Sequence, residues 1–208
     1  MDTILIEKNK YIYRGNMYGD DEVESLLKQI GKRVKLVILG ENPLIKICDE
    51  VKKQTSKAIE ENIMANLIID EDTIVDYDYD KRLKKLYIYS IKQGIKANKI
   101  LWKADKITVK PIQYIMRDII KSKFKFKNSY KAIMGYNDYL YFIEVDNKRL
   151  ISTTTIEFTN TNLYKIVNNK LVGEILLVDL NLEEKLVDCD LFKNINFINL
   201  KEKINYEI

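Results

Sequence analysis

The chain has 208 residues, of which 46% are apolar and 32% charged, a balance typical of folded globular proteins and far from that of disordered chains. Lys and Arg outnumber Asp and Glu by only four, 35 against 31, which does not indicate a nucleic-acid-binding protein. Histidine is absent and the two cysteines, Cys48 and Cys189, lie far apart, so we expect no zinc or iron site, no serine triad and no histidine-dependent acid–base catalysis.

The first elements predicted along the chain are two strands and a helix. Residues 4–7 and 11–14 are β-type runs, and the polar residues between them suit a hairpin loop. Asp20 and Asp21 are expected to cap a helix whose apolar residues follow helical spacing, and Gly31 is expected to end it.

A longer series of strands and one long helix follows. The apolar run 34–40 is typical of a central strand, and 44–47 of a further strand. A long helix is expected from Asp49 to about Asn66. The segments 73–80 and 86–91 alternate as a half-solvated antiparallel pair does, so they predict a second hairpin.

The first half closes with a helix at about 92–103, a strand at 107–110 and a helix at 112–121 that Pro111 begins. The segment 121–129 (KSKFKFKNS) is dense in charge and has no helical stripe. We therefore place a boundary there, which divides the chain into residues 1–125 and 126–208.

The second half is predicted to have the order βββαβαβ. Three β-rich runs joined by turn sequences come first, at 130–134, 139–145 and 148–158. A helix at 159–169, a strand at 173–179, a helix at 182–192 and a strand at 194–199 follow. This is the order of ribonuclease H-like folds, and two such lobes in tandem make the actin-like architecture. We therefore expect an α/β, actin-like (ribonuclease H-like), two-lobed fold with mixed sheets, with 1–125 the first lobe and 126–208 the second.

The middle of the chain carries a more specific likeness. A central strand ends at a loop that contains Pro43, and a helix that carries Glu60 and Glu61 then leads to a strand with Asp76, Asp78 and Asp80. A second strand and a helix follow, and they lead to the strand ITVK and to the helix that starts with PIQ. Over roughly residues 35–158 this order resembles the cytoplasmic actin-like proteins of type IV pilus and type II secretion machines, PilM and GspL.

The resemblance implies a non-catalytic scaffold of an inner-membrane assembly platform. The implied partners are a cytoplasmic assembly ATPase and inner-membrane pilus or secretion proteins, with no nucleic acid and with membrane contact only indirect or through a segment beyond this chain; a homodimer is possible. No secretory signal opens the chain, and no stretch approaches the roughly 18 apolar residues that cross a bilayer. We therefore expect a cytoplasmic location at the inner face of the membrane, with buried, reduced thiols.

Nucleotide binding can be tested against the family pattern. Actin-like ATPases hold phosphates with two Asp-x-Gly hairpins, because glycine admits backbone N–H groups to the phosphates and the Asp organises the metal. At the first hairpin position, residues 2–6 begin with Asp2 and contain no glycine; at the second, residues 134–138 keep Gly135 but misplace the acid. We therefore expect no catalytic or cofactor-binding residues, which favours a GspL-like, nucleotide-free protein over a PilM-like one.

Three other features have a functional and a structural interpretation. Alternation along the strand puts Asp76, Asp78 and Asp80 on one face, as a magnesium site requires. The favoured interpretation is an exposed face of a hairpin, where neighbouring Lys and Arg side chains balance the negative charge, so we expect no metal. The Lys/Phe segment 121–127 suits nucleic acid or an anionic membrane, but a solvated linker is favoured. Trp102 is expected to be a core anchor.

The sequence leaves two alternatives open and does not identify a partner-binding surface. One alternative is an actin-fold ATPase or nucleotide-binding protein with degenerate loops. The other is a nucleic-acid or membrane-surface binder that uses residues 121–127.

Overall fold

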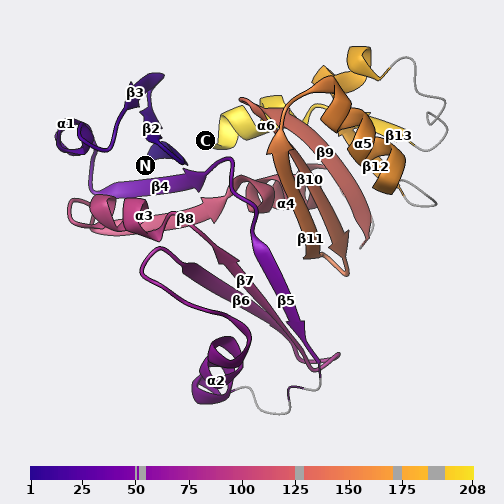
Figure 1. The fold of residues 1–208 in the computed structure, drawn as a ribbon, viewed down its shortest axis with the longest axis horizontal. Coiled ribbons are helices and arrows are strands. Elements are labelled where there is room, and N and C mark those ends of the chain that lie inside the picture. Colours follow the sequence, from indigo (N-terminus) through magenta and orange to yellow (C-terminus); the bar gives the residue numbers. More distant parts are fainter. Residues whose placement is uncertain (50, 52–54, 125–128, 171–174, 187–194) are drawn as a thin grey trace. The chain divides into compact units, whose positions relative to one another are not determined.

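The computed structural model describes residues 1–49, 51, 55–124, 129–170, 175–186 and 195–208 (Figure 1). They form two compact units, Met1–Val109 and Lys110–Ile208. Each unit contains a mixed five-stranded sheet, and the first unit contains a smaller sheet as well.

The main sheet of the first unit, sheet A, has the strand order β3-β2-β1-β4-β8. Its strands are β1 (Asp2–Glu7), β2 (Lys10–Tyr13), β3 (Asn16–Tyr18), β4 (Arg33–Ile38) and β8 (Lys106–Pro111). The first three strands are antiparallel, as the predicted hairpin requires, and β4 pairs parallel to β1. The short strand β3 was not predicted; Arg14 and Gly15, both with positive φ, form the tight turn that leads into it.

Two helices cover one face of sheet A, α1 (Val23–Leu27) and α3 (Gly94–Leu101). The core between them contains the apolar side chains of β1, β2 and β4 together with Leu26, Ala97 and Ile100. The predicted capping of the first helix by Asp20 and Asp21 is wrong. The residue at the N-cap is Glu22, and it makes no side-chain capping bond.

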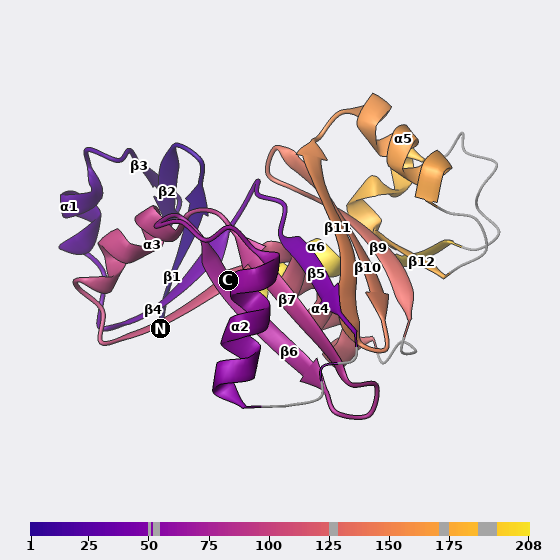
Figure 2. The same ribbon diagram turned by 60° about the horizontal axis from the view of Figure 1, so that its bottom comes forward.

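The smaller sheet, sheet B, has the order β5-β7-β6, with all strands antiparallel. It consists of β5 (Leu44–Cys48), β6 (Ile74–Asp80) and β7 (Lys85–Ile91), so the predicted second hairpin is confirmed. Helix α2 (Ser56–Asn66) lies along one face of this sheet (Figure 2), and Ile59 packs with Leu86 and Ile88.

Helix α2 is shorter than predicted. It begins only after Thr55, whose hydroxyl accepts a hydrogen bond from the Ala58 backbone N–H at 3.3 Å. Residue 50 and residues 52–54 of the expected helix lie outside the described part of the chain.

The second unit contains sheet C, with the order β11-β10-β9-β12-β13. Its strands are β9 (Tyr130–Tyr136), β10 (Tyr139–Asp146), β11 (Arg149–Glu157), β12 (Leu176–Asp179) and β13 (Ile195–Ile198). The first three form the predicted antiparallel meander, and β12 and β13 add parallel to β9.

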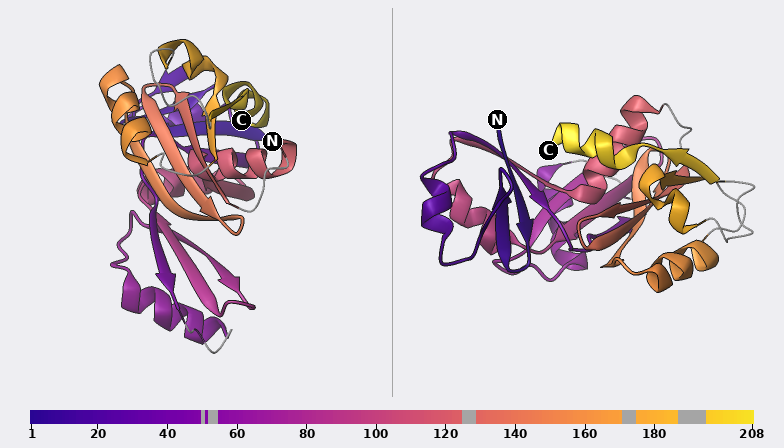
Figure 3. Two further views of the ribbon diagram at one scale, coloured as in Figure 1. Left: turned by 90° about the vertical axis from the view of Figure 1, so that its right-hand side faces the viewer. Right: turned by 90° about the horizontal axis from the view of Figure 1, so that it is seen from above.

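Helices lie on both faces of sheet C (Figure 3). α5 (Asn160–Lys170) packs on one face, and α4 (Ile112–Lys123) and α6 (Leu200–Glu207) pack on the other. The C-terminal helix α6 was not predicted. The helix expected at 182–192 is a 3-10 helix, η1 (Leu180–Lys185), as far as it is described; residues 187–192 lie outside the described part.

The division between the units falls at Val109 and Lys110, whereas the sequence analysis placed it at 125 and 126. The physical reason is the packing of α4, which lies against β10, β11 and α6 of the second unit. In the described part of the chain, no helix is long and apolar enough to cross a bilayer.

Candidate functional site

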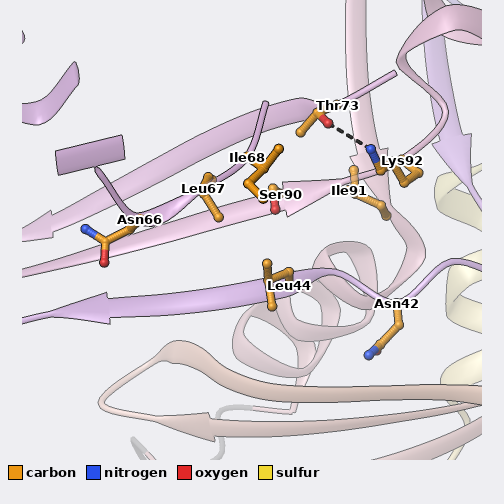
Figure 4. A pocket seen from close by; sticks show the side chains of 9 residues that line it. All are labelled: Asn42, Leu44, Asn66, Leu67, Ile68, Thr73, Ser90, Ile91 and Lys92. Carbon is orange, nitrogen blue, oxygen red and sulfur yellow. Dashed lines mark hydrogen bonds between the residues drawn. The ribbon is translucent and has the colours of Figure 1, made fainter. Parts of the chain in front are cut away.

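A groove of about 330 Å³ opens at one end of sheet B (Figure 4). Leu44 on β5, Ser90 on β7, and Leu67 and Ile68 in the segment after α2 approach the same hollow from different elements. The complete lining is Asn42, Leu44, Asn66, Leu67, Ile68, Thr73, Ser90, Ile91 and Lys92. We call this the sheet B groove.

One wall of the groove is held by a network around Asp70. Lys92 Nζ donates to the two Asp70 carboxylate oxygens at 2.6 and 2.8 Å and to Thr73 Oγ1 at 3.1 Å, and the Thr73 hydroxyl also donates to Asp70. The hydrogen bonds from Lys92 and Thr73 lower the pKa of Asp70 to about 2. The carboxylate is therefore ionised throughout the neutral range and keeps the ammonium group in place.

The same segment is tied to the start of α3. The backbone N–H of Gly94 donates to the Asp72 carbonyl at 2.9 Å, and the Ile95 N–H donates to Asp72 Oδ1 at 3.1 Å. A Cβ at position 94 would lie 2.9 Å from the Asp72 carbonyl carbon and oxygen, closer than real Cβ atoms come. Only glycine admits this approach without a shift of the backbone, so the wall of the groove is anchored to the rest of the unit.

The groove presents large apolar side chains to solvent. Ile68 is 95% exposed and Leu44 is 50% exposed, while Leu67 beside them is buried in the core under α2. β5 is also an edge strand of sheet B. Exposed apolar surface around a hollow marks binding sites for proteins or other apolar ligands. The groove is therefore the candidate site for a partner.

This groove was not predicted from the sequence. The sequence feature that could have indicated the groove is the apolar run Leu67–Ile69. This run follows the last residue of α2, so it does not continue the apolar face of that helix. The predicted helix ended at about Asn66, and the prediction assigned no element to Ile68 and Ile69.

A second hollow of about 480 Å³ in the first unit is lined mainly by charged residues. Lys96 and Lys99 lie 3.2 and 3.4 Å from Asp20, and Gln93 donates to Glu41 at 2.8 Å. Burial raises the pKa of Asp20, but the hydrogen bonds and charges of the two lysines outweigh it and bring this pKa below its ordinary value. Asp20 is thus paired with both lysines, as is typical of a structural network.

The first hairpin loop was predicted correctly, but the Asp-x-Gly pattern was tested at the wrong position, residues 2–6. The β1–β2 turn lies at Lys8 and Asn9, between the paired residues Glu7 and Lys10, and it too contains no glycine. Asp2 lies instead at the start of β1.

Asp2 has a structural environment. Its carboxylate accepts hydrogen bonds from the Gly31 backbone N–H at 2.7 Å and from the Tyr13 hydroxyl at 3.0 Å. The bond from Gly31 is the main cause that lowers the pKa of Asp2. Asp2 thus fixes the segment before β4 to sheet A.

The second hairpin turn lies at Asn137 and Asp138, and Asn137 has a φ of 50°. Gly135 precedes this turn, within β9. A Cβ at Gly135 would lie 2.8 Å from Phe158 Cε1 and 3.2 Å from Leu182 Cδ2. Packing against Phe158 and Leu182 therefore explains this glycine without a phosphate.

The three aspartates of β6 lie on one face of the strand, as their alternation predicts. Across the hairpin, Asp76 and Asp78 pair with tyrosines of β7, and both are exposed. Asp80 accepts hydrogen bonds from the backbone N–H groups of Arg82 and Leu83 at 2.9 and 3.0 Å, which holds the β6–β7 turn. Within the described ranges, no group of three or more Cys, Asp or Glu side chains is placed to hold a metal ion.

Trp102 was expected in the core, and this prediction is wrong: the side chain is 91% exposed. In the Lys/Phe segment, Lys121 and Lys123 are exposed at the end of α4 and Phe124 is half-buried, whereas residues 125–128 lie outside the described part.

The two cysteines were expected to be buried. Cys48 is half-buried, and burial is the main cause that raises the pKa of its thiol. Cys189 lies outside the described residues.

No family model and no curated protein matches this chain. Among solved structures, a Bacteroides thetaiotaomicron protein with an actin-like ATPase fold and unknown function is 13% identical, with 95% of this chain and 91% of that chain covered and a TM-score of 0.54. The cytoplasmic domain of EpsL, an inner membrane component of the type II secretion system of Vibrio cholerae, is 12% identical over 85% of this chain and 79% of that chain, with a TM-score of 0.46.

A chain of the PilM–PilN type IV pilus biogenesis complex is 6% identical over 76% of this chain and 54% of that chain, with a TM-score of 0.44. Identities this low establish the fold alone. The first of these likenesses, together with the mixed sheets of both units, confirms the predicted fold class. The chain is an α/β protein with an actin-like fold.

Proposed function

We propose that this chain is a non-catalytic scaffold that docks partner proteins through the sheet B groove, within the inner-membrane assembly platform of a type IV pilus or a type II secretion system. The proposed partners are a cytoplasmic assembly ATPase and a membrane-anchored protein, and the proposed location is the cytoplasmic side of the membrane. The observation that carries the proposal is the groove with Ile68 and Leu44 exposed at its rim.

The physical argument for docking is the apolar surface that a partner would cover. Full burial of one aliphatic side chain such as Ile68 is worth about 1.5–3 kcal/mol, because its surface leaves water. Few side chains carry most of the energy of a protein interface, and they lie in pockets from which water is excluded. The fixed wall formed by Asp70, Thr73 and Lys92 supports this use, since a groove that is already ordered loses little entropy on binding.

Two observations support a scaffold without nucleotide chemistry. Neither hairpin turn that would face phosphates in an actin-like ATPase contains glycine: the residues there are Lys8 and Asn9 in the first unit, and Asn137 and Asp138 in the second. Side chains at these turns occupy the space that backbone N–H groups need to approach a phosphate. The platform itself is suggested by the resemblance of residues 35–158 to PilM- and GspL-type proteins.

The groove is tested by replacing Ile68 with Asp in cells that build the pilus or secretion machine. An exposed residue can be changed with little effect on folding, while a carboxylate in the groove would have to lose its water when an apolar partner binds. We expect the Ile68→Asp variant to accumulate at normal levels, to keep its circular dichroism spectrum and to lose assembly.

The matched control is Tyr206→Asp, which places the same charge at an exposed aromatic residue of α6. It should support assembly as the unchanged chain does. A photo-crosslinking amino acid at position 68 should join the chain to a platform protein. Normal assembly by the Ile68→Asp variant, or equal loss in both variants, would refute the proposal.

A further inference from the structure

The only tryptophan of the chain projects from the end of α3. Trp102 is 91% exposed and Leu101 before it is 50% exposed, whereas Ile100 is completely buried. Successive helical residues are turned by about 100°, so a helix that buries Ile100 directs the following residues away from the core. Nothing in the packing of sheet A uses the indole ring, so its exposure points to a function outside the core.

Basic residues follow this tryptophan in its own loop and lie in the adjacent loop before β4. Trp102 and Lys103 belong to the loop that leads into β8, and this loop lies beside the one that leads into β4: the Lys106 backbone N–H donates to the Lys32 carbonyl at 3.0 Å. Lys32 also lies 3.2 Å from Asp105. Strands β4 and β8 start at the same end of sheet A (Figure 1), which places both loops at that end.

The charge of these two loops is strongly positive. Lys28, Lys32, Arg33, Lys103 and Lys106 are all exposed, against two acids: Asp105, which pairs with Lys32, and Asp2, which accepts a hydrogen bond from the Gly31 N–H. The exposed acids nearest in the sequence, Asp21, Glu22 and Glu24, belong to the start of α1 rather than to the loops. We call the exposed side chains Leu101, Trp102, Lys103, Lys106, Lys32 and Arg33 the tryptophan surface.

We infer that the tryptophan surface binds directly to a membrane that contains anionic lipids, with the indole in the headgroup region. Tryptophan prefers the boundary between water and hydrocarbon, and clustered Lys and Arg are attracted by anionic lipids. Protein interfaces differ, since lysine is depleted in them; here lysines flank a lone exposed indole. The inference goes beyond the scaffold function and differs from the expectation that membrane contact is only indirect or through a segment beyond this chain.

The single tryptophan gives this inference a specific optical test. Vesicles of phosphatidylcholine and phosphatidylglycerol in equal parts should shift the emission of the purified chain to shorter wavelength, because the ring leaves water. Vesicles of phosphatidylcholine alone should not. Raising the salt from about 0.1 M to 1 M shortens the screening length from about 10 Å to 3 Å and should reverse the shift.

Variants measured by vesicle sedimentation locate the surface. Each basic residue near an anionic bilayer contributes about fivefold to partitioning, so Lys103→Gln with Lys106→Gln should weaken binding about 25-fold. Trp102→Ala should weaken it as well. The matched control is Lys121→Gln with Lys123→Gln, which removes two exposed lysines of α4 and should bind as the unchanged chain does.

The outcomes separate this inference from the scaffold proposal. The groove variant Ile68→Asp should bind vesicles normally even though it loses assembly. The inference is overturned if the anionic vesicles cause no shift, if neutral vesicles cause the same shift, or if the control pair weakens binding as much as the Lys103 and Lys106 pair. It is also overturned if a crosslinker at position 102 captures a protein while the chain does not bind vesicles.

Discussion

Replacing Gly135 with Ala tests whether this glycine is kept for packing or for a phosphate. The added Cβ would lie 2.8 Å from Phe158 Cε1 and 3.2 Å from Leu182 Cδ2, and real Cβ atoms do not come within 3.0 Å of a heavy atom. Overpacking of this kind costs about 1–3 kcal/mol. The smaller freedom of Ala in the unfolded chain returns about 0.4–1 kcal/mol. We therefore expect the free energy of unfolding to fall by about 1–2 kcal/mol.

The assay is unfolding in guanidinium chloride followed by circular dichroism, with the melting temperature as a second measure. In a chain of this length each kcal/mol lowers the melting temperature by about 2–4 °C. The Phe158→Ala background supplies the matched control, because it removes the ring that the new methyl group meets. In that background Gly135→Ala should cost less by about 0.5 kcal/mol or more, which a double-mutant cycle measures.

Two results would refute the packing argument. One is a Gly135→Ala variant as stable as the unchanged chain. The other is the same loss of stability with and without the Phe158 ring, since the clash would then not be its cause.

Three further predictions concern nucleotide binding, Asp179 in the second unit and the three aspartates of β6. Millimolar Mg-ATP should leave the melting temperature unchanged, whereas a ligand at a hundred times its dissociation constant would stabilise the chain by about 2.7 kcal/mol; a clear rise would contradict the nucleotide-free function. Burial raises the pKa of Asp179, whose Oδ1 accepts the Leu200 backbone N–H at 3.0 Å. Folding therefore favours the protonated form of Asp179. The stability that this form contributes is complete below the ordinary pKa of 3.8, and it is lost as the pH rises through the raised pKa of the folded chain. The free energy of unfolding of Asp179→Asn, minus that of the unchanged chain, should therefore grow from acid to neutral pH; a difference that stays constant or shrinks would contradict this. Finally, the triple Asn variant of Asp76, Asp78 and Asp80 should fold and support assembly, and its failure while the partner still co-purifies would reopen an enzymatic function.

Most of the secondary structure followed from local sequence patterns. β-rich runs separated by turn sequences predicted β9, β10 and β11. Alternation of apolar and polar residues predicted the β6–β7 hairpin, because side chains of a strand point alternately to opposite faces. Continuous apolar runs predicted β4 and β12, whose residues are almost all buried. The order of these elements was sufficient for the fold class, since order and type of elements restrict the possible topologies.

Elements with weak local signals were missed or misplaced. β3 has three residues and α6 eight, too few for a periodic pattern to stand out. The β1–β2 turn at Lys8 and Asn9 was predicted, but the phosphate pattern was tested at Asp2, because the turn itself carries no glycine or aspartate. The unit boundary was placed after α4 because charge density is visible in a sequence, whereas the sheet on which a helix packs is not.

The candidate surfaces depended on tertiary structure alone. Ile68 and Trp102 are large apolar residues, and composition assigns such residues to a core. Whether they are buried depends on which element lies over them: Leu67 is covered by α2 and sheet B while Ile68 is not, and Ile100 faces sheet A while Trp102 does not. The sequence by itself determined the local elements and their order, because these depend on near neighbours in the chain. Only the packing of distant segments decided which apolar side chains remain in solvent, and therefore where this protein can bind.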